Sequence, residues 1–313
     1  MSLMFEWIAS VVTDPNVRWI LFGSMLLGFS SGLIGSFTYL RKQSLIGDTL
    51  AHAALPGICI AFMLSGVKST FLFMIGALVA GWMATIGISL ITRYSRIKQD
   101  TALGIVLSVF FGIGIVLLTK IQHGDYGSAS GLDKYMFGQA ASMVRSDVYM
   151  MLGVSVLLLI VCWLLFKEFK LISFDAGFAR GMGYPSAFLE QLLLFLTVIA
   201  VVAGVQVVGV VLVAALLITP AAAARYWTNA LGLMVCLAGL FGAISGALGT
   251  LISATTPDLP TGPVTVLVIT LIFGVSVLIA PGRGLLAKEI RKYRTKTDYN
   301  NQQQSVNRAE VSK

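Results

Sequence analysis

Two ionisable side chains, Asp48 and His52, lie four residues apart inside an otherwise apolar stretch of the sequence. If this stretch is a helix, positions i and i+4 share one face, and their Cβ atoms are about 5–6 Å apart. A carboxylate oxygen and an imidazole nitrogen can then point at one cation. Ionisable residues in membrane-spanning segments are costly and typically functional. The spacing therefore indicates a metal or proton site, with a structural Asp–His hydrogen bond between helices as the simpler alternative.

Pro56 and Cys59 extend this candidate site along the same stretch. Proline has no amide hydrogen, so Pro56 leaves the carbonyl of His52 without its normal helical donor and open to a metal, a water or a neighbouring helix. Cys59 falls seven residues after His52, on roughly the same helix face, and could serve as a further soft ligand. A buried structural cysteine is the more ordinary interpretation of Cys59.

Two ligands from one chain leave a metal site incomplete. If two copies of the chain pair symmetrically, two Asp48 and two His52 side chains converge and offer a mixed nitrogen and oxygen set suited to manganese, iron or zinc. The lack of a clear thiolate set argues against copper. Ligand type does not select manganese, because such sites bind zinc more tightly than manganese.

The elements that must position these residues are membrane-spanning helices. Of the 313 residues, 57% are hydrophobic and 12% are charged, whereas soluble domains carry roughly 25% charged residues. A helix needs about 20 apolar residues to cross a bilayer. The sequence therefore predicts an all-α, polytopic transmembrane helical bundle of about nine spans, or eight to ten because the sixth and seventh are nearly continuous. The predicted spans are 19–40, 44–65, 70–92, 101–119, 148–166, 187–203, 205–224, 230–253 and 264–280.

The placement of Lys and Arg predicts the orientation of these spans. With the N-terminus outside, most basic residues fall in cytoplasmic connections and in the C-terminal stretch 283–296, as the positive-inside rule requires. The C-terminus is then cytoplasmic. Three regions are predicted: an N-terminal surface segment (1–16), a transmembrane domain (17–288) and a disordered cytoplasmic tail (289–313).

Pairs of glycines four residues apart predict close helix packing. Gly28 and Gly32 form one GxxxG pair, and Gly242 and Gly246 form another. In lipid, where no water-driven force presses helices together, such small residues let two backbones approach closely. We therefore assign these glycines to helix contacts rather than to chemistry.

The connection 167–186 is too long for a simple turn and is predicted to hold a short helix. Ser173 or Asp175 could cap its start, and Gly181 and Gly183 could end it. Apolar residues recur at i, i+4 and i+8 and would form one stripe on that helix; they are Phe174, Phe178 and Met182. Such a helix either lies on the lipid surface or docks into a cytoplasmic partner, and the pattern alone favours neither.

Several function classes lack the motifs that they need. The net charge of +8 arises from residues at the ends of apolar runs, which does not indicate nucleic-acid binding. The three cysteines show no paired spacing for disulfides or zinc. A GxxxxGK[ST] phosphate loop and an HExxH motif are both missing from the sequence, so we do not expect an enzyme. A proton- or sodium-coupled transporter and a structural membrane scaffold remain as alternatives.

Four stretches resemble the metal-type ABC permeases, a family that imports manganese, zinc or iron. The stretch 36–56, SFTYLRKQSLIGDTLAHAALP, contains the Asp–His pair and is similar to the family's main motif. The stretch 131–143, GLDKYMFGQAASM, resembles its outer loop and looks most like the manganese branch. The stretch 174–185, FDAGFARGMGYP, resembles its coupling segment, and 216–224, LLITPAAAA, resembles its Thr-Pro motif. The motifs occur in the family's order.

The resemblance implies a permease subunit in a bacterial cytoplasmic membrane, surrounded by lipid, with no permanently bound cofactor. It implies three partners: a dimer of ABC ATPase subunits, an extracytoplasmic metal-binding protein and a second permease copy. Asp48 and His52 would be transient ligands of the transported divalent metal, manganese or alternatively zinc or iron. The coupling segment would receive the motion of the ATPase, and its residues would be Phe174, Asp175, Gly177, Phe178, Arg180, Gly181, Met182 and Gly183.

Overall fold

The chain folds into a bundle of long helices in the regions that the structure describes. This computed structural model describes residues 15–66, 69–123, 145–256, 259–281 and 284–289. The predicted N-terminal surface segment, the 131–143 motif and the C-terminal tail fall almost entirely outside these residues, so their structures stay predictions. Each of the nine predicted spans falls mainly on one long helix, although the span 205–224 also includes the last four residues of α10. These helices are α2 (Pro15–Leu40), α3 (Ile46–Ser65), α4 (Thr70–Tyr94), α5 (Gln99–His123), α7 (Arg145–Leu164), α10 (Ser186–Val208), α11 (Val210–Trp227), α12 (Leu231–Thr255) and α13 (Thr261–Ile279).

The helices confirm a polytopic membrane bundle. Within the described residues, eight helices are long and apolar enough to cross a bilayer, and a shorter apolar helix spans Leu212–Trp227. The boundary between α10 and α11 falls at Gly209, whose φ of 85° is a left-handed conformation that glycine adopts without strain. The two nearly continuous predicted spans are therefore separate helices. The prediction of nine spans rather than eight stays open.

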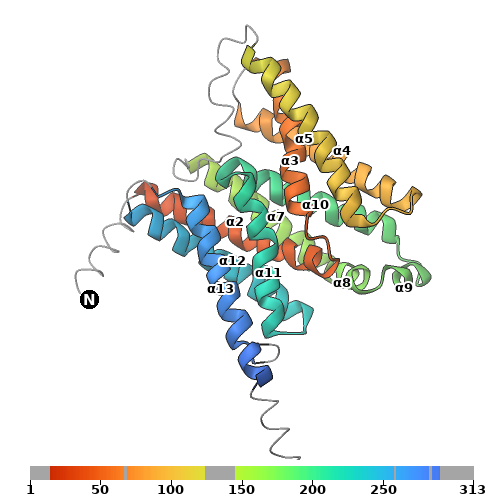
Figure 1. Cartoon of the computed structure of the whole chain (residues 1–313), viewed down its shortest axis with the longest axis vertical. Coiled ribbons are helices and arrows are strands. Elements are labelled where there is room, and N and C mark those ends of the chain that lie inside the picture. The colour runs from red at the N-terminus through yellow and green to blue at the C-terminus, as the bar shows by residue number, and fades with distance from the viewer. Residues whose placement is uncertain (1–14, 67–68, 124–144, 257–258, 282–283, 290–313) are drawn as a thin grey trace, which may run out of the picture.

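The glycine pairs bring α2 and α12 into close contact, which confirms the predicted close helix packing; the sequence did not predict that the two pairs would face each other. Figure 1 shows the two helices lying side by side. A methyl group added at Gly28 would overlap the carbonyl oxygen of Gly242, and one added at Gly246 would overlap that of Ser24. Gly32 meets Ala238 in the same way. The small residues thus allow backbone-to-backbone packing that larger side chains would prevent.

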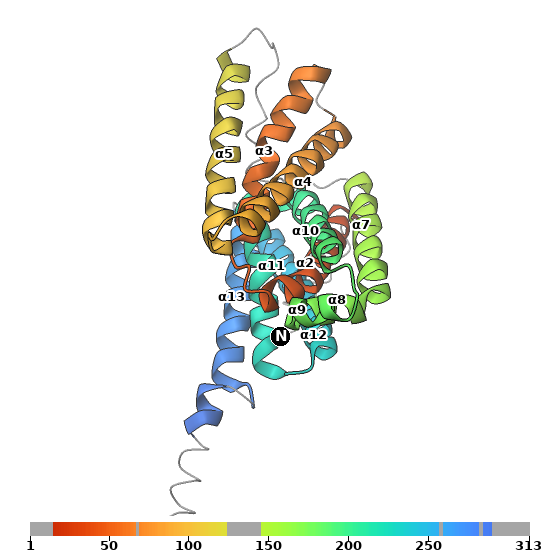
Figure 2. The same cartoon turned by 90° about the vertical axis from the view of Figure 1, so that its right-hand side faces the viewer.

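Helices α3, α4 and α5 form a second group, which extends away from α13 in both views (Figures 1 and 2). Helix α3 is the most enclosed of the three, with buried side chains such as Leu50, Ala54 and Phe62. Gly57 on α3 meets Gly76 on α4 so closely that a methyl group on either would overlap the other's carbonyl oxygen. The Asp–His pair therefore lies on a helix held firmly by its neighbours.

Large apolar side chains cover the outside of the bundle. Val116, Trp163 and Leu267 are 68%, 76% and 68% exposed, and they come from three different helices. In a soluble protein such a surface would cause association. In lipid it is the expected outer face, because the hydrocarbon core is as apolar as these side chains.

The connection after α7 contains two short helices instead of one. Helix α8 (Phe166–Phe174) ends at Asp175, which begins α9 (Ala176–Gly181). The Asp175 carboxylate accepts a hydrogen bond of 2.8 Å from the amide of Phe178, so Asp175 is the predicted cap and Ser173 is not. Gly183 follows with a φ of 85°. The prediction of one continuous stripe-bearing helix is wrong, because the extended backbone at Asp175 separates Phe174 from the residues after it.

Candidate functional site

Asp48 and His52 occupy the first two turns of α3. The helix runs without interruption from Ile46 to Ser65, so the two residues share a face as the i, i+4 spacing predicts. Asp48 lies in the first turn, where the positive end of the helix dipole favours a carboxylate. Pro56 is buried within the helix, and it removes the donor that the His52 carbonyl would otherwise have.

Both side chains are available to a ligand. Asp48 and His52 are each half-buried, and neither makes a hydrogen bond or an ion pair with another described residue. The carboxylate is near enough to the imidazole to act on it electrostatically. The structure therefore contains no Asp–His hydrogen bond of the kind that the structural alternative requires.

Phe111 on α5 limits how the His52 ring can turn. The two ring centroids are 4.8 Å apart and the ring planes meet at 72°, an edge-to-face arrangement. Such aromatic pairs contribute about 0.5–1.5 kcal/mol beyond the area that they bury. Phe111 thereby orients the imidazole, whose nitrogens have no hydrogen-bonding partner among the residues that the structure describes.

Cys59 does not join the pair. Its side chain is fully buried, and its Sγ lies 3.9 Å from the carbonyl oxygen of Gly114 on α5. Seven residues of helix also place it about 10 Å along the axis from His52. This position favours the structural interpretation of Cys59.

Within the described residues of one chain, no three His, Cys, Asp or Glu side chains gather as a metal-binding group. The Asp48–His52 pair thus offers two ligands only. A metal ion held there would need waters, backbone oxygens or side chains from another chain to complete its coordination.

A polar cluster near α3 was not predicted from the sequence. Arg41, in the turn between α2 and α3, lies with its Nη2 3.5 Å from Oε1 of Glu190 on α10, and their side chains are 13% and 32% exposed. Burial lowers the pKa of the Arg41 guanidinium, and the Glu190 carboxylate opposes this shift. Glu190 is the single charged residue of the predicted span 187–203. A lone charge in an apolar span is a signal that could have identified Glu190 from the sequence.

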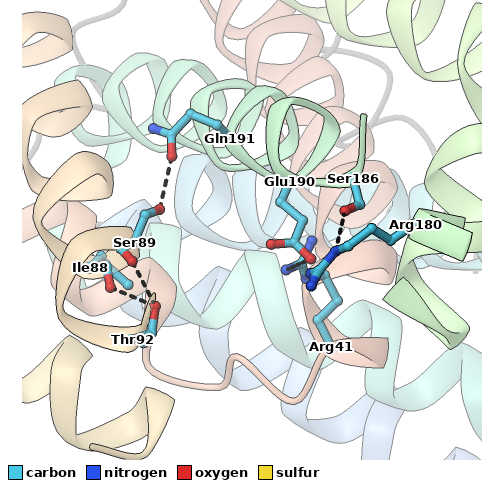
Figure 3. Close-up of polar contacts among 8 residues, drawn as sticks. All are labelled: Arg41, Ile88, Ser89, Thr92, Arg180, Ser186, Glu190 and Gln191. Carbon is cyan, nitrogen blue, oxygen red and sulfur yellow. Dashed lines mark hydrogen bonds and ion pairs between the residues drawn. The ribbon is translucent and has the colours of Figure 1, made fainter. Parts of the chain in front are cut away.

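Arg180 joins the predicted coupling segment to the same cluster. Its Nε donates to Oγ of Ser186, the first residue of α10, over 3.3 Å. Figure 3 shows Arg41, Arg180, Ser186 and Glu190 side by side. Nearby, Gln191 accepts a 2.9 Å hydrogen bond from Ser89 on α4. The segment also exposes Phe174, Phe178 and Met182 by 56%, 58% and 58%, so all three apolar side chains are available to a partner or to lipid.

A family model described as the ABC 3 transport family matches residues 13–280. The chain belongs to the ABC 3 transport family. Its members are transport permeases, which agrees with the bundle of apolar helices and with the family resemblance of the four motifs. The chain is therefore a multi-pass membrane permease.

Relatives within the family carry names that refer to two metals. The chain is 54% identical over 291 residues to the manganese transport system membrane protein MntC of Bacillus subtilis, covering 93% of this chain and 67% of that protein. It is 44% identical to the zinc transport system membrane protein TroC of Treponema pallidum, covering 90% of this chain and 95% of that one.

A solved structure supports the fold in detail. The structure of PsaBC from Streptococcus pneumoniae in complex with Fab matches with a TM-score of 0.78 and 35% identity, over 91% of this chain and 99% of the other. An inward-facing putative metal-chelate type ABC transporter matches with a TM-score of 0.66 at 18% identity, which shows a shared fold alone.

Proposed function

We propose that this chain is the membrane-spanning permease subunit of an ATP-driven importer for divalent manganese. The observation that carries the proposal is the Asp48–His52 pair, which shares one face of an enclosed apolar helix and has no hydrogen-bonding partner among the described residues. Membership of the ABC 3 transport family and 54% identity to a manganese permease support it. Zinc is the second candidate, because TroC is 44% identical, and iron fits the same ligand chemistry.

Asp48 and His52 act as transient ligands along the path of the ion. A carboxylate oxygen and a neutral imidazole nitrogen together bind a divalent transition metal. Two ligands hold an ion weakly enough for release, whereas a complete protein shell would trap it. Pairing with a second permease copy brings a second Asp48 and His52 to the path, which agrees with the two-ligand site within one chain.

The other partners have separate roles. An extracytoplasmic metal-binding protein delivers the ion, and a dimer of ABC ATPase subunits supplies the energy. The segment from Phe174 to Gly183 receives the ATPase motion, with Phe178 exposed on α9. The Arg180–Ser186 hydrogen bond then transmits this motion to α10. The chain lies in a bacterial cytoplasmic membrane with its N-terminus outside and its C-terminus in the cytoplasm.

The test is radioactive manganese uptake into vesicles that contain this permease, its ATPase and its binding protein. We compare the wild type with Asp48→Ala and His52→Ala, and use Cys59→Ala as a control on the same helix. Both site variants should abolish ATP-dependent uptake while the complex still assembles, and the control should transport. Competition by zinc and iron ranks the three metals.

Three results would overturn parts of the proposal. Uptake that survives both site substitutions would return the pair to a structural role. Uptake without ATP would indicate a proton-coupled secondary transporter instead. Zinc that competes more effectively than unlabelled manganese and is itself transported faster would replace manganese as the substrate.

A further inference from the structure

A cavity of about 440 Å³ lies between the C-terminal end of α4 and the N-terminal part of α10. It is distinct from the Asp48–His52 pair, because neither residue lines it. Three guanidinium groups line the cavity, from Arg41, Arg93 and Arg180, against the single carboxylate of Glu190. The cavity therefore has an excess of positive charge.

Part of this charge lacks a protein partner. Glu190 pairs with Nη2 of Arg41, but Nη1 of Arg41 is buried and makes no hydrogen bond to any described residue. Arg93, at the end of α4, is exposed and forms no ion pair within the described residues. A buried guanidinium nitrogen without an acceptor is costly, and a bound anion would satisfy it.

The rest of the lining is mixed, with polar residues such as Ser89 and Gln191 beside apolar ones such as Leu90 and Leu194. Leu90 lines the cavity and is 51% exposed on α4, and Leu194 lines it from α10. Tyr94 stands at the end of α4 beside Arg93 and is 81% exposed. Aromatic residues and basic residues at the ends of membrane helices mark the level of lipid headgroups.

We propose that this cavity binds the phosphate headgroup of an anionic phospholipid, with the acyl chains lying along Leu90 and the outer face of α4. The guanidinium groups bind the phosphate oxygens, as Arg does in bidentate geometry. The exposed Leu90 side chain distinguishes a lipid from a soluble phosphate, which would gain nothing from it. Basic pockets between membrane helices are a recognised form of anionic lipid site.

The site has a consequence for the transporter. Its ligands come from the turn before α3, from α4, and from the segment that contains Arg180. A headgroup bound there bridges these three elements. Two of them, the turn and the Arg180 segment, also meet α10 through the Arg41–Glu190 ion pair and the Arg180–Ser186 hydrogen bond. Anionic lipid should therefore stabilise the folded permease.

The experiment measures lipid binding to the purified full-length permease by native mass spectrometry and by thermal stability in detergent. The probes are phosphatidylglycerol, zwitterionic phosphatidylcholine and inorganic phosphate. Arg93→Gln removes one cavity cation from an exposed position, and Arg96→Gln is its matched control, because Arg96 is also exposed but does not line the cavity. Ala187→Trp fills the cavity from α10 without changing charge.

We expect phosphatidylglycerol to bind the permease and to raise its melting temperature. Phosphatidylcholine should bind clearly more weakly. Arg93→Gln should weaken phosphatidylglycerol binding roughly fivefold, the effect of one cation near a headgroup. Ala187→Trp should abolish the preference for anionic lipid, and Arg96→Gln should change binding less than twofold.

Other outcomes would overturn the proposal. Equal binding of phosphatidylglycerol and phosphatidylcholine would show that the cavity does not select an anionic lipid. An equal loss of phosphatidylglycerol binding in Arg93→Gln and Arg96→Gln would attribute the binding to diffuse surface charge. Inorganic phosphate that displaces phosphatidylglycerol with similar affinity would assign the site to a soluble anion. Loss of ATPase association in Arg93→Gln, with lipid binding unchanged, would make the cavity a protein-docking surface. None of these readouts depends on which metal is transported.

Discussion

Arg41 and Glu190 form an ion pair of 3.5 Å that joins the turn before α3 to the N-terminal part of α10. Four residues before Glu190, Ser186 accepts a hydrogen bond from Arg180 of the predicted coupling segment. The chain of contacts therefore runs from the coupling segment through α10 to the turn that begins the helix of Asp48. The ion pair is the contact in this chain that can be tested most directly.

Glu190→Ala should destabilise the permease, because it leaves the Arg41 guanidinium buried without its carboxylate. A fully buried pair costs roughly 3–5 kcal/mol when one partner is removed, and the partial exposure of Glu190 reduces this to about 2 kcal/mol. Adding Arg41→Ala to Glu190→Ala should restore part of the lost stability. A double-mutant cycle, with stability measured by thermal denaturation in detergent, detects this non-additivity. Strictly additive effects would show that the two residues act independently.

Gly57→Ala should disturb the Asp48–His52 site without touching it. The new methyl group would overlap the Gly76 carbonyl oxygen, so α3 and α4 must separate. Overpacking of this kind costs about 1–3 kcal/mol, and we expect lower thermal stability and lower metal uptake. Gly112→Ala on α5 is the matched control, since nothing lies within 4 Å of its added carbon. A Gly57→Ala protein as stable and active as the control would contradict the close contact.

Phe178→Ala should weaken the association with the ATPase if the α9 segment docks into the ATPase. The side chain is 58% exposed, so its loss removes contact area for a partner and little from the core. Co-purification of the ATPase with the permease should fall several-fold. Phe71→Ala is the control, because Phe71 is 63% exposed at the start of α4, outside the coupling segment. Equal co-purification of both variants would favour the alternative that α9 only rests on lipid.

Asp175→Ala should loosen the α9 segment, which contains Phe178, without removing an exposed side chain. The substitution removes the side-chain hydrogen bond to the Phe178 amide, which costs about 1 kcal/mol at a helix start. Because α9 has six residues, we expect local unfolding of the segment, measured as faster amide hydrogen exchange at residues 176–181. Asp175→Asn retains a capping oxygen and should keep slow exchange. Fast exchange in both variants would show that the charge, not the cap, holds the segment.

Cys59→Ala should leave manganese uptake within twofold of the wild type. The Cys59 Sγ faces the Gly114 carbonyl rather than the Asp48–His52 pair, so the substitution removes packing and no ligand. A loss of about 1 kcal/mol of stability is expected, typical of single substitutions. Uptake that collapses while the protein remains folded would restore Cys59 as a ligand.

Local patterns in the sequence predicted the helices well. The apolar runs identified all nine long helices, because a polypeptide in lipid must satisfy its backbone hydrogen bonds within each segment. The shared helix face of Asp48 and His52 followed from their i, i+4 spacing and helix geometry alone. The cap at Asp175 was also predicted, since a capping side chain bonds to the backbone only three residues away. The break at the same residue was missed, because the apolar recurrence suggested one helix.

The sequence did not predict which residues of different helices meet, and the tertiary structure decided these contacts. Phe111 beside His52, Gly114 beside Cys59 and Glu190 beside Arg41 join residues that are far apart in sequence. In a membrane protein the faces toward lipid and toward other helices are both apolar, so hydrophobic patterning does not tell which face packs on which neighbour. The amino-acid sequence by itself thus determined the apolar helices, the Asp–His pair and the small residues that permit close helix packing. Only the packing of the bundle decided which side chains surround that pair and where the arginine-lined cavity forms, because both depend on helices that meet through three-dimensional shape.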